Sequence, residues 1–143
     1  MADIALTFDS GVKTLELSDG KGHSIEVTFN PYDVMFFGTI MEAAEKLDAE
    51  QSKLAGIQSD DWKEIYKACM DSDKAMRGII DDIFNAPVCD ALFPNQTVHA
   101  IGNGFPAWCN LLYAITDHMD SGLEAEKQKT QERIKKYSGK YKK

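Results

Sequence analysis

The chain has 143 residues, the usual length of one domain, and 43% of them are apolar, which is enough for a single core. With 23 acidic and 16 basic residues its net charge is −7, which excludes a protein that coats nucleic acid with its whole surface. No apolar run approaches the roughly 18 residues that span a membrane, no secretory signal is recognisable, and three unpaired cysteines indicate a reducing compartment, so we expect a cytoplasmic protein.

The charge is divided between two regions of opposite sign. From Leu123 onward, eight Lys or Arg residues accompany three Glu residues, so this region carries +5 and residues 1–122 carry −12. The basic region has few apolar residues but many good helix formers. We therefore predict one acidic domain over residues 1–122 and a basic, helical, projecting tail over residues 123–143.

The first thirty residues alternate between apolar and polar side chains, the pattern of strands that place one face on a core. The apolar sets are Ile4, Leu6 and Phe8, then Leu15 and Leu17, then Ile25, Val27 and Phe29. Turn residues separate the sets at Asp9–Gly11 and Ser18–Gly22. The pattern predicts a three-stranded antiparallel meander within about residues 3–29, which needs a covering layer because so small a sheet is marginal alone.

Three main helices are predicted to supply that layer, over about residues 31–55, 59–85 and 105–122. Asn30 and Pro31 indicate the start of the first helix, and Ser59–Asp61 that of the second. The face predicted to be buried on the second helix consists of Trp62, Ile65, Tyr66, Cys69, Met76, Ile80, Ile83 and Phe84. A short helical turn over residues 88–93 and a loop precede the last helix. The predicted fold is α+β, with the meander packed on a bundle of three main helices and a long basic C-terminal helix.

Residues with catalytic or metal-binding chemistry do not converge on a site. Cys109 is expected on the core side of the last helix, His99 in a loop and His118 on an exposed helix face, so no thiol–imidazole pair is predicted. The pairs Asp60–Asp61 and Asp81–Asp82 are adjacent residues, which point about 100° apart on a helix. We expect no catalytic residue, metal or cofactor, and an enzyme that uses Cys109 with either histidine is the least favoured alternative.

Two regions are candidates for binding a partner. The start of the first helix is apolar around almost its whole circumference, through Val34, Met35, Phe36, Phe37, Ile40 and Met41. These side chains either cover the sheet or form a groove for an amphipathic partner helix, and both interpretations stay open. The second region is the basic tail, with Arg133, Lys135, Lys136 and Tyr137. We expect the tail to be solvated or to bind a protein, because the acidic body repels nucleic acid.

Three short motifs carry a resemblance to a known family. They are Phe29–Asp33 at the junction of strand and helix, Ile79–Phe84 before a Leu92–Phe93 turn, and a late helix that ends in a Lys-rich tail. Their order resembles that of the tail assembly chaperones of long-tailed, siphovirus-type bacteriophages and of prophages in Gram-positive bacteria. The resemblance covers roughly residues 12–143, and none of its motifs is catalytic.

The resemblance implies a non-enzymatic helper in phage tail assembly. Such a protein binds the tape measure protein, keeps it soluble in the host cytoplasm, and helps tail tube subunits assemble around it. It is then absent from the mature virion, and a frameshifted longer form is often made. The alternative is a structural protein of the tail or of the head–tail junction. Self-association stays open, and neither nucleic acid nor a membrane is expected as a partner.

Overall fold

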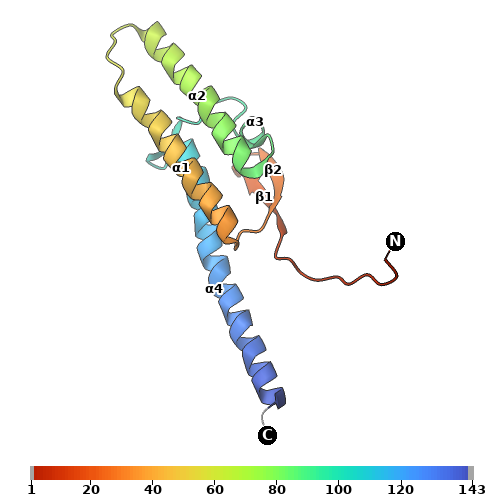
Figure 1. The fold of residues 1–143 in the computed structure, drawn as a ribbon. Coiled ribbons are helices and arrows are strands. Elements are labelled where there is room, and N and C mark those ends of the chain that lie inside the picture. Colours follow the sequence, from red (N-terminus) through yellow and green to blue (C-terminus); the bar gives the residue numbers. More distant parts are fainter. Residues whose placement is uncertain (1, 142–143) are drawn as a thin grey trace.

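The computed structural model describes residues 2–141, with side chains as far as residue 136 (Figure 1). In chain order it contains strands β1 (Lys13–Ser18) and β2 (Ser24–Phe29), helices α1 (Val34–Ala55), α2 (Trp62–Phe84) and α3 (Val88–Leu92), strands β3 (Ile101–Gly102) and β4 (Phe105–Pro106), and helix α4 (Ala107–Tyr141). The predicted α+β class is confirmed. The described residues form two two-stranded antiparallel sheets, however, and the predicted three-stranded meander is wrong.

Strands β1 and β2 form a hairpin from the second and third alternating sets. Leu15 pairs with Val27, and the same register places the apolar side chains of both strands on one face. The Asp19 carboxylate closes the turn, because it accepts hydrogen bonds from the backbone N–H groups of Lys21 and His23 at 2.7 and 3.1 Å. The hairpin therefore presents one apolar face to the helices.

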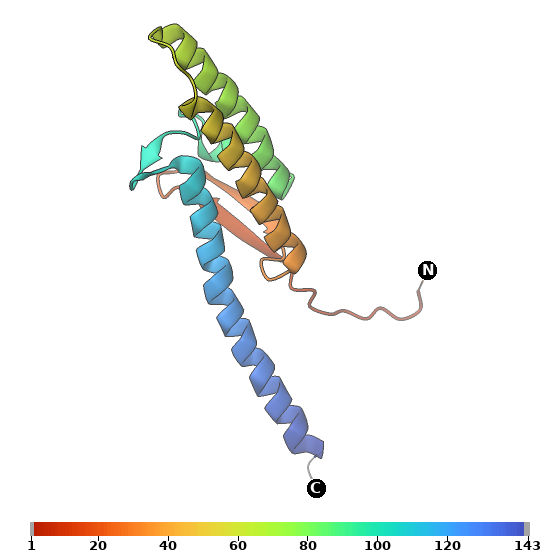
Figure 2. The same cartoon turned by 60° about the vertical axis from the view of Figure 1, so that its left-hand side comes forward.

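The predicted first strand does not form. Residues 2–12 lie in no strand and leave the body as an extended segment (Figures 1 and 2). The N–H of Gly11 donates to the Asp9 carboxylate at 2.8 Å, and the Asn30 side-chain amide donates to the Ser10 carbonyl at 3.1 Å. These bonds hold the chain at the end of β2 and not along the outer edge of β1. Alternation identifies the apolar and polar faces of a strand. It does not identify the strand edge with which the segment pairs, because pairing depends on residues far away in the sequence.

Helices α1 and α2 begin later than predicted because aspartates cap them. Asp33 is the N-cap of α1 and accepts a hydrogen bond from the N–H of Met35 at 3.3 Å. Asn30 instead accepts from the N–H of Tyr32 at 2.9 Å, which closes the turn before the helix. Asp61 caps α2 in the same way as Asp33 caps α1. The two helices run antiparallel beside each other (Figure 1).

The hydrophobic core lies where the β1–β2 sheet, the α1–α2 pair and the first half of α4 meet. Phe36 of α1 stacks on Phe29 of β2 with ring centroids 4.2 Å apart, and Phe84 of α2 packs against both rings. Helix α4 contributes Leu112 and Ile115, both buried. The most deeply buried side chains include Ile40, Leu47, Met76, Ile80, Val88, Cys89 and Val98.

Helices α1 and α2 extend beyond the sheet at their connected ends (Figure 1). The 23 residues of α2 span about 34 Å, whereas the six residues of β1 span about 20 Å. The buried face predicted for α2 is therefore wrong over its first half. Trp62, Ile65 and Tyr66 are exposed, while Met76 and Ile80 are buried as predicted.

A buried ion pair ties α2 to the loop before β3. Asp73 accepts hydrogen bonds from the Arg77 guanidinium at 2.9 Å and from the backbone N–H of Val98 at 2.7 Å. The same guanidinium donates to the carbonyl oxygens of Phe93 and Gln96 at 2.7 and 2.5 Å. Asp73 and Arg77, in the middle of α2, thus hold the loop.

Helix α4 is continuous over 35 residues and passes through Gly122 without a break (Figures 1 and 2). Its second half projects from the body, so the domain and the basic tail share one helix. It begins directly after the β3–β4 hairpin, where we predicted only a loop. The turn of that hairpin is Asn103 and Gly104, both with positive φ, which is the usual chemistry of a two-residue hairpin turn.

Candidate partner-binding surfaces

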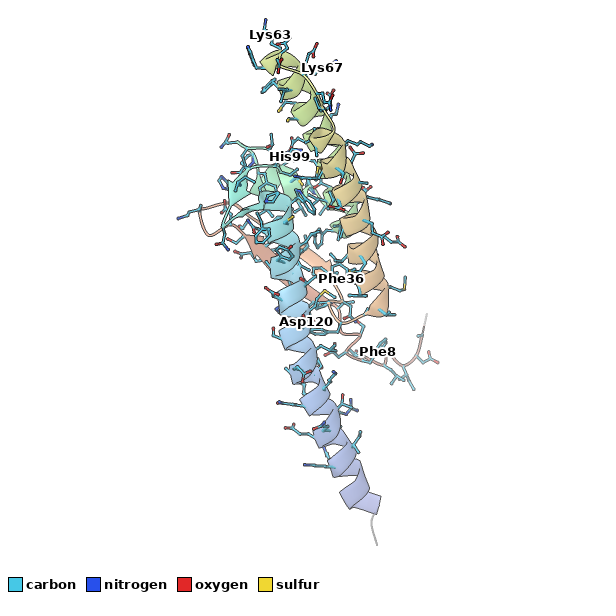
Figure 3. The ribbon with its side chains drawn as sticks, turned by 90° about the vertical axis from the view of Figure 1, so that its left-hand side faces the viewer. Phe8, Phe36, Lys63, Lys67, His99 and Asp120 are labelled. Carbon is cyan, nitrogen blue, oxygen red and sulfur yellow. The ribbon has the colours of Figure 1, made fainter. Side chains whose placement is uncertain are left out.

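Helix α1 divides the predicted apolar set between two faces. Phe36 and Ile40 are buried in the core, and Figure 3 shows Phe36 pointing into the body. The exposed members are Val34, Met35, Phe37 and Met41. Val34, Phe37 and Met41 lie three and four residues apart, so they form one stripe along the outside of the helix. The buried members cover the sheet, and only the exposed members are available to a partner.

The exposed stripe borders a groove between α1 and α4. This groove, with a volume of about 270 Å³, is called here the α1–α4 groove, and it is lined by Pro31, Tyr32, Asp33, Val34, Phe37, Met119, Asp120 and Leu123. Its lining is mostly apolar, and its two acidic residues, Asp33 and Asp120, are exposed. An apolar lining with exposed acidic residues matches an apolar helix face that is flanked by Lys or Arg.

Tyr32 lines the α1–α4 groove and lies against α4 at Gly122. A Cβ atom at Gly122 would overlap the phenol ring of Tyr32, so glycine at this position lets α4 approach the start of α1 closely. The rings of Tyr32 and His118 lie 6.5 Å apart on the same side of α4. The segment that leads into α1 therefore contacts α4 through Tyr32.

A second apolar surface lies on the overhanging end of the α1–α2 pair. We call it the α1–α2 end patch, and its residues are Ile57, Trp62, Ile65, Tyr66 and Met70, all exposed. The rings of Trp62 and Tyr66 meet edge to face at 6.4 Å, and Lys63 and Lys67 lie beside them (Figure 3). Sequence periodicity assigned most of these residues to the core. The lengths of the predicted helix and strands gave the missing signal, since the helix is too long for the sheet.

The predicted basic residues of the tail lie on the projecting half of α4. Arg133, Lys135 and Lys136 are exposed, far along the helix from the α1–α4 groove. Tyr137 belongs to the helix, but its side chain lies outside the described residues. Earlier in this half, Lys127 and Lys129 pair with glutamates three residues before them at 3.5 and 3.4 Å. The tail and the apolar stripe therefore form two separate surfaces and not one site.

The cysteines and histidines are not arranged for nucleophilic catalysis. Burial raises the pKa of the Cys109 thiol, with a smaller contribution from the charge of Asp48, which disfavours the reactive thiolate. Both ring nitrogens of His99 are buried without a hydrogen-bond partner, so this ring is not bonded to a thiol. His118 is exposed on α4. The more buried Cys89 also has a raised pKa, chiefly because of desolvation.

One residue of each acidic pair has a structural role at a helix end. Asp61 caps α2, and Asp81 accepts a hydrogen bond from the N–H of Cys89 at 2.9 Å, which holds the start of α3. Asp81 is half-buried, whereas its neighbour Asp82 is exposed. Within residues 2–141, no three His, Cys, Asp or Glu side chains are grouped to hold a metal ion. Within the same range, no helix is long and apolar enough to cross a membrane.

Comparison of the chain with models of known protein families, with curated proteins and with solved structures finds no match. The surfaces described above are therefore interpreted from their own chemistry.

Proposed function

We propose that this protein is a tail assembly chaperone of a long-tailed bacteriophage or prophage, which binds the tape measure protein. The observation that carries the proposal is the exposed stripe of Val34, Phe37 and Met41 beside the α1–α4 groove. Contiguous exposed apolar side chains on a small protein usually mark a binding surface. Phe and Met are well suited to a long partner with many similar apolar segments, because Met adapts its shape and Phe contributes a large contact area.

The proposed mechanism is the reversible covering of apolar helix faces. A partner helix places apolar residues three and four positions apart in the α1–α4 groove, and its basic flanking residues lie near Asp33 and Asp120. The net charge of −12 over residues 1–122 then keeps the complex soluble, because complexes of like charge repel one another. The basic tail, separated from the groove, is left to contact the tail tube protein.

Co-expression with the tape measure protein tests the proposal. Phe37→Ser removes a phenyl ring that is 49% exposed, so we expect the fold to remain and the affinity to fall about tenfold or more, the loss expected when one Phe contact is removed. The measurement is the amount of soluble tape measure protein that co-purifies, followed by titration with its fragments. Phe36→Ser is unsuitable, because Phe36 is buried in the core.

Phe105→Ser provides the matched control. Phe105 is 47% exposed and lies on β4, outside the α1–α4 groove, so the same chemical change should leave binding unaltered. Equal binding by the wild type and the Phe37→Ser variant would contradict the groove proposal. Mass spectrometry of purified virions separates the chaperone from the structural alternative, since a chaperone is lost from the particle and a tail or head–tail junction protein remains in it.

A further inference from the structure

The outer edge of β1 is open and faces a long groove. In the described part of the chain β1 pairs with β2 alone, which leaves the N–H and C=O groups of its other edge without a strand partner. Two adjoining cavities of about 380 and 250 Å³ share Ser18, Leu111 and Ala114 and run between β1 and α4. We call these cavities the β1–α4 groove, and the side chains of Leu15 and Leu17 open into it.

The N-terminal segment has the sequence of a strand but lacks a partner. Ile4, Leu6 and Phe8 are 76%, 89% and 82% exposed, and they alternate with small or polar residues. In both ribbon views the segment runs away from α4 and from the body, and Figure 3 shows Phe8 apart from the core. Three large apolar side chains in an extended segment gain most by adding to an open sheet edge.

The segment matches the open edge at Ile4, Leu6 and Thr7. An antiparallel register that pairs Leu6 with Leu15 extends the existing row from Leu15 to Val27, and it places Ile4 beside Leu17. On the opposite face the same register puts Thr7 beside Thr14. Thr14 already shares a hydrogen bond with Thr28 of β2, at 3.0 Å between the two hydroxyl oxygens. Ile4 and Leu6 then face the β1–α4 groove and Thr7 faces solvent, while Phe8 lies beside Lys13 on the same face as Leu15.

Within one molecule, the N-terminal segment is directed away from the open edge of β1. The Asn30 amide holds the Ser10 carbonyl, and a Cβ at Gly11 would lie 2.6 Å from that amide, so the connection is packed against the end of β2. Strand β2 lies on the opposite side of β1 from the open edge. Folding back along its own β1 would require the chain to leave Asn30, whereas the edge of another molecule is reached without that change.

We propose that residues 4–8 of one copy add as a third strand to β1 of a second copy, with Ile4, Leu6 and Phe8 filling its β1–α4 groove. Two copies that exchange segments reciprocally form a closed pair with two three-stranded sheets. The exchange covers the most exposed apolar side chains of the segment in both molecules. It uses neither the exposed stripe of α1 nor the basic tail, although the β1–α4 groove shares Pro31 and Met119 with the α1–α4 groove of the proposed function.

Light scattering during size-exclusion chromatography of the full chain, over a range of concentrations, gives the first test. We expect a dimer or larger assembly that Leu6→Lys dissociates, with an apparent dissociation constant raised tenfold or more. Thr7→Lys adds the same charge on the face toward solvent and should preserve the assembly. A monomer at every concentration, or a Leu6→Lys variant that associates like the wild type, would overturn the proposal.

Cross-linking between chains gives the second test and separates exchange from folding back. Leu6→Cys and Leu15→Cys variants are purified separately, mixed and oxidised, and the products are mapped by mass spectrometry. We expect a disulfide between the two introduced thiols, because paired residues of adjacent strands lie within disulfide distance. A mixture of Leu6→Cys with Thr14→Cys, whose side chains face opposite sides, should cross-link far less. A double variant that carries both Leu6→Cys and Leu15→Cys is oxidised in parallel. If a disulfide forms only within the double variant and not between the two single variants, or does not form at all, the proposal is wrong.

Discussion

Replacing Asp73 with alanine removes the carboxylate that joins α2 to the loop before β3. In the wild type this side chain is buried, and its two oxygens accept from Arg77 at 2.9 Å and from the N–H of Val98 at 2.7 Å. Alanine leaves a buried N–H without a partner and a guanidinium without its buried counter-charge. Arg77 keeps the carbonyl oxygens of Phe93 and Gln96 and the more distant Asp90 carboxylate at 3.6 Å.

The size of the effect follows from these remaining contacts. Breaking a buried ion pair usually costs about 3 to 5 kcal/mol, and an unsatisfied buried N–H accounts for about 1 to 3 kcal/mol of such a loss. Because Arg77 retains two carbonyl acceptors and its side chain is 20% exposed, the lower end of this range applies. We expect Asp73→Ala to lower the free energy of unfolding by about 3 kcal/mol.

Urea denaturation followed by circular dichroism measures this loss, with the slope of the transition checked for constancy. Asp71→Ala is the matched control, because Asp71 is exposed on the same helix and its replacement should change the stability by no more than about 0.5 kcal/mol. If both variants unfold at the same urea concentration, the tether between α2 and the loop does not stabilise the fold and the reasoning fails.

Two further predictions concern a pair of glycines and a histidine. Gly78 lies on an open face of α2, so Gly78→Ala should raise the free energy of unfolding by about 0.5 to 1 kcal/mol. Gly122→Ala should raise the free energy of unfolding by less or should lower it, because the added Cβ meets the ring of Tyr32. Equal shifts of the melting temperature in the two variants would refute this difference. Burial lowers the pKa of His99, so the unfolded chain takes up the proton first, and the free energy of unfolding should fall as the pH drops through about 6.5. Urea denaturation at several pH values should show a smaller fall in His99→Gln, and an unchanged fall would contradict the assignment.

Local chemistry made part of the fold predictable. The hairpin of β1 and β2 follows from two alternating runs around a turn in which Asp19 accepts from two N–H groups. The start of α2 follows from Asp61, which caps the helix and lies within the predicted start signal Ser59–Asp61. In both cases the determining contacts join residues within a few positions of each other, so the sequence pattern contains them.

The errors arise where the outcome depends on distant segments. Ile4, Leu6 and Phe8 alternate like the residues of β1, but pairing needs an edge that local sequence does not specify. Trp62 repeats with helical spacing like Met76, yet only Met76 lies in the hydrophobic core. For the candidate site, the sequence identified an apolar helix start, while its division into a core face and a binding face required the orientation of α1.

The projecting half of α4 changes how the two charged regions of the chain act. From Leu123 to Tyr141 the helix extends about 28 Å, whereas electrostatic attraction is screened over about 8 Å at physiological ionic strength. The basic side chains near Arg133 therefore lie beyond the reach of most of the acidic body, which does not neutralise them. The projecting half of α4 therefore acts as a cationic surface separate from the anionic body. A partner with an acidic surface is attracted to this half of the helix and is repelled by the body.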